Sequence, residues 1–199
     1  MNDTAILRPP AGFLAERRAF LSGVGKATLS ASAVALIVGC ESLAQGTSTA
    51  ASDAAILNAA LGLEHEGITA YQLGAESGLL QKPVLDVAVM FKNHHEEHRE
   101  ILIGAIRKLG GTPVAPKSKD EYARALNAAS LKSQTDVLRL AARLERGAAN
   151  AYIGVMPSFG DRALAQVAAR LVADETMHWT VLSQALGDKL PVKALAFGA

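Results

Sequence analysis

Glu175 and His178 are the residues of this chain whose types and spacing best suit the binding of a metal ion. Residues three apart on an α-helix leave the same face. Leu171 and Leu182 share that face, so the pair is expected to point into a helical core, where an unpartnered charge is costly. A bound cation would compensate the carboxylate, with the imidazole as a second ligand.

Three other predicted helices also have a carboxylate or imidazole within an otherwise apolar, core-facing stripe. In residues 53–78 and 133–156, apolar side chains recur at spacings of three and four, and a glutamate breaks each stripe. The stripe of residues 83–109 contains two histidines. The polar residues in the four core-facing stripes are Glu64, His95, His98, Glu145, Glu175 and His178. We therefore expect three carboxylates and three imidazoles to face one helical core.

Local signals mark the ends of these helices. Ser52 or Asp53 is expected to cap the first helix, and Ser133 the third. The fourth is expected over residues 161–186, closed by Gly187. Between the second and third helices, residues 110–132 form a longer connection, with a short helix expected at 120–129. At about 3.3 Å per residue this connection can cross the whole bundle.

The chain also contains an internal repeat. Each of two glutamates is followed seven residues later by a tyrosine, and a histidine lies 34 residues after the first glutamate and 33 after the second. The matched positions are Glu64 with Glu145, Tyr71 with Tyr152, and His98 with His178. The repeat predicts two helical hairpins related by a pseudo-twofold axis, with the six polar residues at one level of the core.

This pattern resembles the ferritin-like superfamily, and most closely the exported bacterial proteins with a stand-alone ferritin-like domain. The resemblance covers about residues 53–187 and implies an all-α, antiparallel four-helix bundle with one long crossover between helices 2 and 3. In such bundles two helices each supply one glutamate and two supply Glu-x-x-His. The resemblance makes Glu64 and Glu145 the single glutamates and Glu175 with His178 one Glu-x-x-His pair, and it implies no catalytic residue beyond the metal ligands.

One position departs from that pattern. Where the second Glu-x-x-His should begin, the chain has His95, and His98 completes the pair. Glu96 and Glu97 are turned away by about 100° and 200° on a helix of 3.6 residues per turn, so neither simply substitutes. The loss of a carboxylate should weaken binding of a second metal ion. A mononuclear or asymmetric site is therefore an open alternative.

Iron, as one or two ions, is the expected metal, with zinc or manganese as alternatives. Added imidazole favours Fe or Zn over Mn. The expected chemistry is oxidation of Fe(II) by dioxygen or peroxide, and a manganese catalase-like activity is a weaker reading. The rival hypothesis is a non-enzymatic bundle that sequesters metal or protects the envelope under stress, its buried charges pairing as glutamate–histidine hydrogen bonds.

The N-terminal residues look like a targeting segment. Arg17-Arg18 followed by a short apolar stretch resembles a twin-arginine export signal over residues 1–40. Cys40, the single cysteine, ends a stretch similar to a lipobox, so periplasmic export or a lipid anchor in the envelope is expected; a membrane anchor, or a cleaved signal with an incidental cysteine, is the alternative. Residues 41–52 read as a flexible tether and 188–199 as a C-terminal tail.

The remaining inferences concern partners and flanking residues. With 20 basic and 19 acidic residues, the chain has no basic footprint for nucleic acid, so metal ions and a second copy in a homodimer are the candidate partners. Tyr71 and Tyr152 are expected to pack in the core with hydroxyl partners, a redox role being the alternative. His65 and His94 are expected at the surface, although His94 with His98 is an alternative ligand pair.

Overall fold

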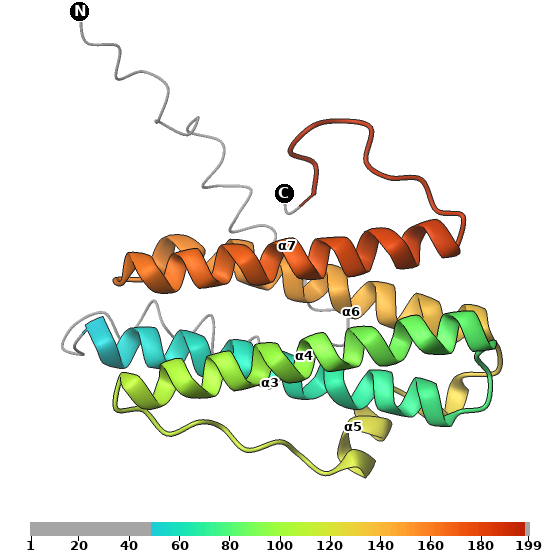
Figure 1. The fold of residues 1–199 in the computed structure, drawn as a ribbon, viewed down its shortest axis with the longest axis horizontal. Coiled ribbons are helices and arrows are strands. Elements are labelled where there is room, and N and C mark those ends of the chain that lie inside the picture. Colours follow the sequence, from blue (N-terminus) through green and yellow to red (C-terminus); the bar gives the residue numbers. More distant parts are fainter. Residues whose placement is uncertain (1–48, 198–199) are drawn as a thin grey trace, which may run out of the picture.

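The computed structural model describes residues 49–197, and within this range the chain is an all-helical bundle without strands. Its four long helices are α3 (Thr49–Glu76), α4 (Lys82–Lys108), α6 (Gln134–Val155) and α7 (Arg162–Ala185). α3 packs against α4, and α6 against α7, as two antiparallel hairpins, and α3 also contacts α6 (Figure 1). The expected all-α bundle of paired antiparallel helices is confirmed.

The predicted export signal at residues 1–40 lies outside the described residues. Among residues 49–197, none of the helices combines the length with the hydropathy needed to cross a bilayer.

Most helix ends lie close to their sequence signals. Ser133 caps α6 by accepting a hydrogen bond from the Asp136 backbone N–H. Gly110 and Gly187, which follow α4 and α7, have φ of 76° and 73°, a conformation that favours glycine.

The start of the first helix differs from the prediction. α3 begins at Thr49, so the last four residues of the predicted 41–52 tether are helical, and neither Ser52 nor Asp53 is a cap. Alanine-rich sequence favours this extension. The Asp53 carboxylate is buried and accepts the backbone N–H groups of Gly160 (2.9 Å) and Asp161 (3.0 Å). Asp53 therefore ties α3 to the turn between the two later helices, a tertiary role that local sequence does not reveal.

The crossover connects the two hairpins along the α3–α4 side of the bundle (Figure 1). It contains α5 (Lys119–Ala125), which overlaps the short helix expected at 120–129 but begins one residue earlier and ends four residues earlier, and the 3-10 turn η2 (Ala128–Ser130). Ser118 and Glu121 form a reciprocal capping box at the start of α5. A second 3-10 turn, η3 (Met156–Ser158), leads from α6 toward α7.

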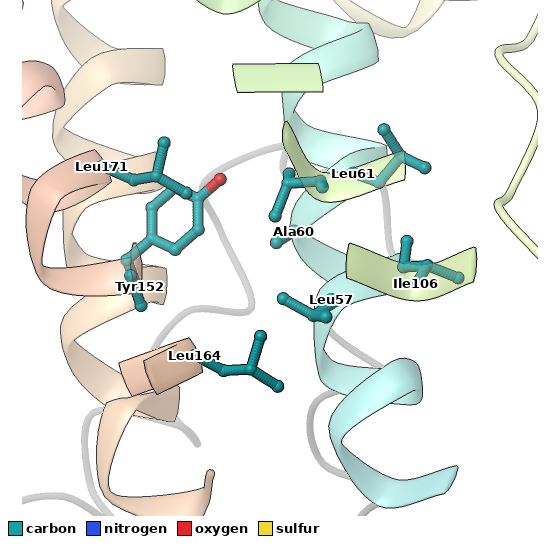
Figure 2. Packing of buried hydrophobic residues seen from close by; sticks show 9 residues of the cluster. Leu57, Ala60, Leu61, Ile106, Tyr152, Leu164 and Leu171 are labelled. Atoms are coloured by element: carbon teal, nitrogen blue, oxygen red, sulfur yellow. The ribbon is translucent and has the colours of Figure 1, made fainter. Parts of the chain in front are cut away.

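Two apolar clusters fill the bundle on either side of one polar level. Figure 2 shows the first, in which Leu57 and Leu61 from α3 lie with Ile106, Leu164 and Leu171 from the other helices. The second cluster lies on the other side of the polar level and includes Tyr71, Phe91, Leu138, Ala142 and Leu182. Each long helix contributes to both clusters, so the residues between them on all four helices are held at one depth in a closely packed core.

Candidate metal centre

The six polar residues expected in the core stripes are all buried, with at most 4% of their surface exposed. They form two overlapping groups in which one ligand atom per residue lies within 4.8 Å of the others. The first group consists of Glu64, His95, His98 and Glu175; the second consists of His95, Glu145, Glu175 and His178. The structure thus brings together every predicted ligand, and His95 and Glu175 belong to both groups.

His95 lies between the two single glutamates. Its Nδ1 is 2.7 Å from Glu64 Oε2, and its Nε2 is 3.2 Å from Glu145 Oε1. Burial alone would lower the pKa of His95, but the charge of Glu175 and the hydrogen bonds with Glu145 and Glu64 raise this pKa well above the usual value. Protonated on both nitrogens, His95 donates to both carboxylates and bridges α3 and α6.

The two single glutamates are held as carboxylates. Burial opposes ionisation of Glu64, but the hydrogen bond with His95 and the nearby imidazole of His98 outweigh it and lower the pKa of Glu64 to about 2. Burial opposes ionisation of Glu145 too. The neighbouring Glu175, His178 and His95 nevertheless hold the pKa of Glu145 well below the usual value.

Glu175 is the carboxylate with the least compensation. It is fully buried, and neither of its oxygens has a hydrogen-bond partner. Its Oε1 lies 3.2 Å from His98 Nδ1 and its Oε2 lies 3.5 Å from His178 Nδ1. Burial raises the pKa of Glu175 to about 7, with His95 acting in the opposite direction and the neighbouring Glu145 adding to the rise. A carboxylate in these surroundings is suited to a cation.

The unpartnered atoms test whether a metal ion fits here. Among the described residues, six buried side-chain nitrogen and oxygen atoms have no hydrogen-bond partner, and five of them belong to this cluster. The five are His98 Nδ1, Glu145 Oε2, both Glu175 oxygens and His178 Nδ1. Buried polar atoms are rarely left unpaired, and carboxylate oxygens with imidazole nitrogens are the usual donors to Fe, Zn and Mn. The donor set therefore fits a first-row transition metal.

An outer pair of residues orients the two inward-facing imidazoles. His98 Nε2 lies 3.2 Å from Asp174 Oδ2, and His178 Nε2 lies 3.0 Å from His94 Nδ1. Both imidazoles thus engage an outer group through Nε2 and present Nδ1 to the centre. Partners of this kind fix the tautomer and the ring plane of a metal-binding histidine.

His94 and Asp174 occupy matching places in the repeat, each one residue before the first position of its motif, His95 or Glu175. His94 is partly exposed, so the expectation of a surface position is partly met; it belongs to neither ligand group, and its Nδ1 contacts His178 instead. The sequence signal for both outer residues is this position in the repeat.

The tyrosines of the repeat cross between the hairpins. Tyr71 of α3 donates its hydroxyl to Glu145 of α6, and Tyr152 of α6 donates to Glu64 Oε1 of α3 over 2.5 Å. Burial raises the pKa of both hydroxyls well above the usual value, so they stay protonated donors. The expectation of core tyrosines with hydroxyl partners is confirmed, and the partners are the two single glutamates.

His65 is also placed differently from the prediction. It is buried, with 5% of its surface exposed, and its Nε2 lies 3.1 Å from the Val114 carbonyl oxygen of the crossover. Burial lowers the pKa of His65. The crossover covers this side of α3, which the periodicity of the helix alone cannot indicate. His65 fastens the crossover and lies outside both ligand groups.

Comparison with known proteins agrees with this architecture. A family model described as a ferritin-like domain matches residues 52–188. A search of curated proteins gives no match. The chain is similar to the crystal structure of a conserved hypothetical protein from Mycobacterium tuberculosis, with a TM-score of 0.58, 23% identity, and coverage of 74% of this chain and 98% of that one. That likeness concerns the fold. Because the family match spans well over half of its residues, the chain belongs to the ferritin-like domain family.

Proposed function

We propose that this protein binds iron at the Glu/His cluster and oxidises Fe(II) with dioxygen or peroxide. The observation that carries the proposal is the set of buried, unpartnered donor atoms on Glu145, Glu175, His98 and His178. Neither oxygen of Glu175 accepts a hydrogen bond, so its charge is uncompensated. A cation bound among these unpartnered atoms would have donors from three helices.

Each residue of the cluster would have its own role in holding the metal. Glu175 lies in both ligand groups and would help to hold an ion at either of the two candidate metal positions. Glu64 would bind the ion at one position and Glu145 the ion at the other. The hydroxyls of Tyr152 and Tyr71, which donate to these two carboxylates, would hold them in place. The imidazoles of His98 and His178 would bind through Nδ1. Iron bound by these groups would supply the redox chemistry, passing electrons to the oxidant.

His95 makes the two positions unequal. Its two ring nitrogens are engaged by Glu64 and Glu145, where a second Glu-x-x-His would have supplied a carboxylate. A protonated imidazole cannot bind a metal, so an ion held through His95 would have to displace a proton from it. We therefore expect one tight and one weak position.

Iron titration of the purified full chain tests this proposal. The protein is stripped with chelator, then titrated anaerobically with Fe(II) by calorimetry, and the rate of Fe(III) formation after adding oxygen or peroxide is compared with buffer. Wild-type protein should bind iron and accelerate oxidation, whereas Glu175→Gln should do neither. Glu100→Gln, which changes an exposed glutamate on α4, is the matched control. Binding without acceleration would refute the oxidase activity, and absence of binding would refute the site.

The second candidate is a non-enzymatic bundle with a degenerate site, and the hydrogen bonds of His95 favour it. An imidazolium between Glu64 and Glu145 supplies one positive charge to the cluster without any metal. In that case chelator-treated protein should unfold at the same urea concentration as protein supplied with iron. A shift of the midpoint by iron would exclude a bundle whose site no longer binds metal, and the oxidation assay would then separate metal sequestration from catalysis.

We also propose that the protein is exported, on the strength of the paired arginines 17 and 18 and of Cys40 at the end of an apolar stretch. Replacing Arg17 and Arg18 with lysine should keep the protein in the cytoplasm. Replacing Cys40 with alanine should release it from membranes if the cysteine is lipidated. Fractionation with an antibody measures both outcomes, and unchanged distributions would refute the proposal.

A further inference from the structure

An apolar cavity of about 150 Å³ lies within the second core cluster, toward the ends of α4 and α7. Its walls come from all four long helices, and small side chains such as Ala88 and Ala141 leave the space open. Leu138 and Leu182 lie deep in it, whereas Val181 at its edge is exposed. The cavity is thus reachable from solvent but lined by hydrocarbon.

Two of the residues that line the cavity also contact histidines of the Glu/His cluster. Tyr71 and Phe91 line the cavity. Phe91 stacks on the His178 ring at a centroid distance of 4.0 Å, and the Tyr71 ring lies 5.5 Å from that of His95. The Tyr71 hydroxyl, the main polar group of the lining, is turned away to Glu145. A molecule in the cavity would lie beside the cluster while meeting almost no polar atoms.

The lining determines the class of ligand. A cavity without convergent donors or acceptors holds water poorly, because water needs two to four polar partners. Charged and strongly polar molecules would lose their hydration without compensation. Apolar cavities of roughly this volume hold xenon or a molecule about the size of benzene. We propose that this cavity binds a small, uncharged, apolar molecule, from a dissolved gas to a single hydrocarbon ring, next to the Glu/His cluster.

Xenon and benzene are the probes that test the proposal. Crystals of the full chain are pressurised with xenon, and benzene is titrated into ¹⁵N-labelled protein while backbone shifts are followed. Xenon should lie between Leu138 and Leu182, and benzene should shift the amides around Ala88 and Ala141. Xenon without benzene would limit the ligand to gases, and both together would admit hydrocarbons. If neither probe binds, the proposal is overturned. The measurements use chelator-treated protein, so their outcome is independent of metal binding.

Variants that change the volume provide the controls. Ala141→Leu on α6 and Ala88→Leu on α4 each fill the cavity and should weaken benzene binding by about tenfold or more. Leu138→Ala enlarges the cavity and should retain benzene binding. Ala169→Leu adds the same side chain at an exposed position of α7 and should leave binding unchanged. If benzene binds a filled, folded variant as tightly as wild type, the ligand lies elsewhere and the assignment fails.

Discussion

His94 Nδ1 lies 3.0 Å from His178 Nε2, so a partly exposed imidazole on α4 holds a buried imidazole on α7. The two rings are also stacked, with an interplanar angle of 19°. On the other half of the site, Asp174 of α7 holds His98 of α4 in the same manner. Each hairpin therefore orients the inward-facing histidine of the other, which links the geometry of the Glu/His cluster to the docking of the two hairpins.

Replacing His94 with alanine should weaken metal binding without unfolding the protein. His178 would keep its position in α7 but lose the partner that fixes its ring, and such losses typically cost about 10- to 100-fold in metal affinity. Competition with a chelating dye measures the affinity. His65→Ala is the control, because this histidine fastens the crossover and should change the urea midpoint more than the metal affinity. Equal metal affinities of His94→Ala and wild type would contradict the orienting role.

Replacing Glu175 with glutamine should stabilise the metal-free protein at alkaline pH. The pKa of Glu175 is raised from 4.5 to about 7 in the folded state, mainly by burial, so ionisation of this group opposes folding. Stability that is present below pH 4.5 is therefore lost as the pH rises toward 7. The loss is up to about 3 kcal/mol, and glutamine avoids it.

Urea unfolding of chelator-treated wild type and Glu175→Gln at pH 4.5 and pH 8 measures this effect. The two proteins should be similar at pH 4.5, where Glu175 is protonated, and the variant should be the more stable at pH 8. A constant difference at both pH values would show that ionisation of Glu175 is not the cause. The same substitution should abolish metal binding, so the stability gain would come with loss of function.

The sequence predicted the bundle and the composition of the cluster because both depend on periodicity. Glu64 and Glu145 interrupt apolar stripes, and a residue in register with buried leucines is carried into the core with them. The repeat then aligned the two hairpins. His95 was assigned to the core on the same grounds, and its place in both ligand groups follows from that register.

Residues whose roles depend on other segments were predicted less well. His65 and His94 lie beside the inward stripe, so periodicity placed them at the surface. The crossover covers His65, whereas His94 stays partly exposed and contacts His178 of α7. Asp53 was predicted to be a helix cap, yet its carboxylate accepts a hydrogen bond from a turn more than 100 residues away in sequence. Such contacts depend on tertiary packing, which helical periodicity does not specify.

Replacing Asp53 with alanine should destabilise the protein by about 3 kcal/mol. The substitution leaves the backbone N–H groups of Gly160 and Asp161 without their charged acceptor, in a place where Asp53 has only 1% of its surface exposed. Asp86→Ala, which removes an exposed ion pair with Lys82, should cost under about 1 kcal/mol. Urea midpoints compare the two. Metal stoichiometry should stay the same in both variants, because Asp53 lies outside the ligand groups.

Replacing His95 with glutamate should strengthen the weak metal position. The change creates a second Glu-x-x-His with His98 and replaces an imidazole that is bound to Glu64 and Glu145 with a carboxylate. Four carboxylates balance two divalent ions, whereas the natural three leave the second ion undercompensated. The number of tightly bound Fe(II) ions per chain, measured by calorimetric titration, should therefore rise from about one in wild type to about two in the variant.

The metal-free form of His95→Glu should be less stable than wild type, because four buried carboxylates repel one another and one cation is lost. Added iron should restore its stability by more than it stabilises wild type. His95→Gln is the matched control: it removes the imidazole without adding a carboxylate, so it should not gain the second ion. If His95→Gln and His95→Glu bind the same number of ions, the missing carboxylate is not what makes the site asymmetric.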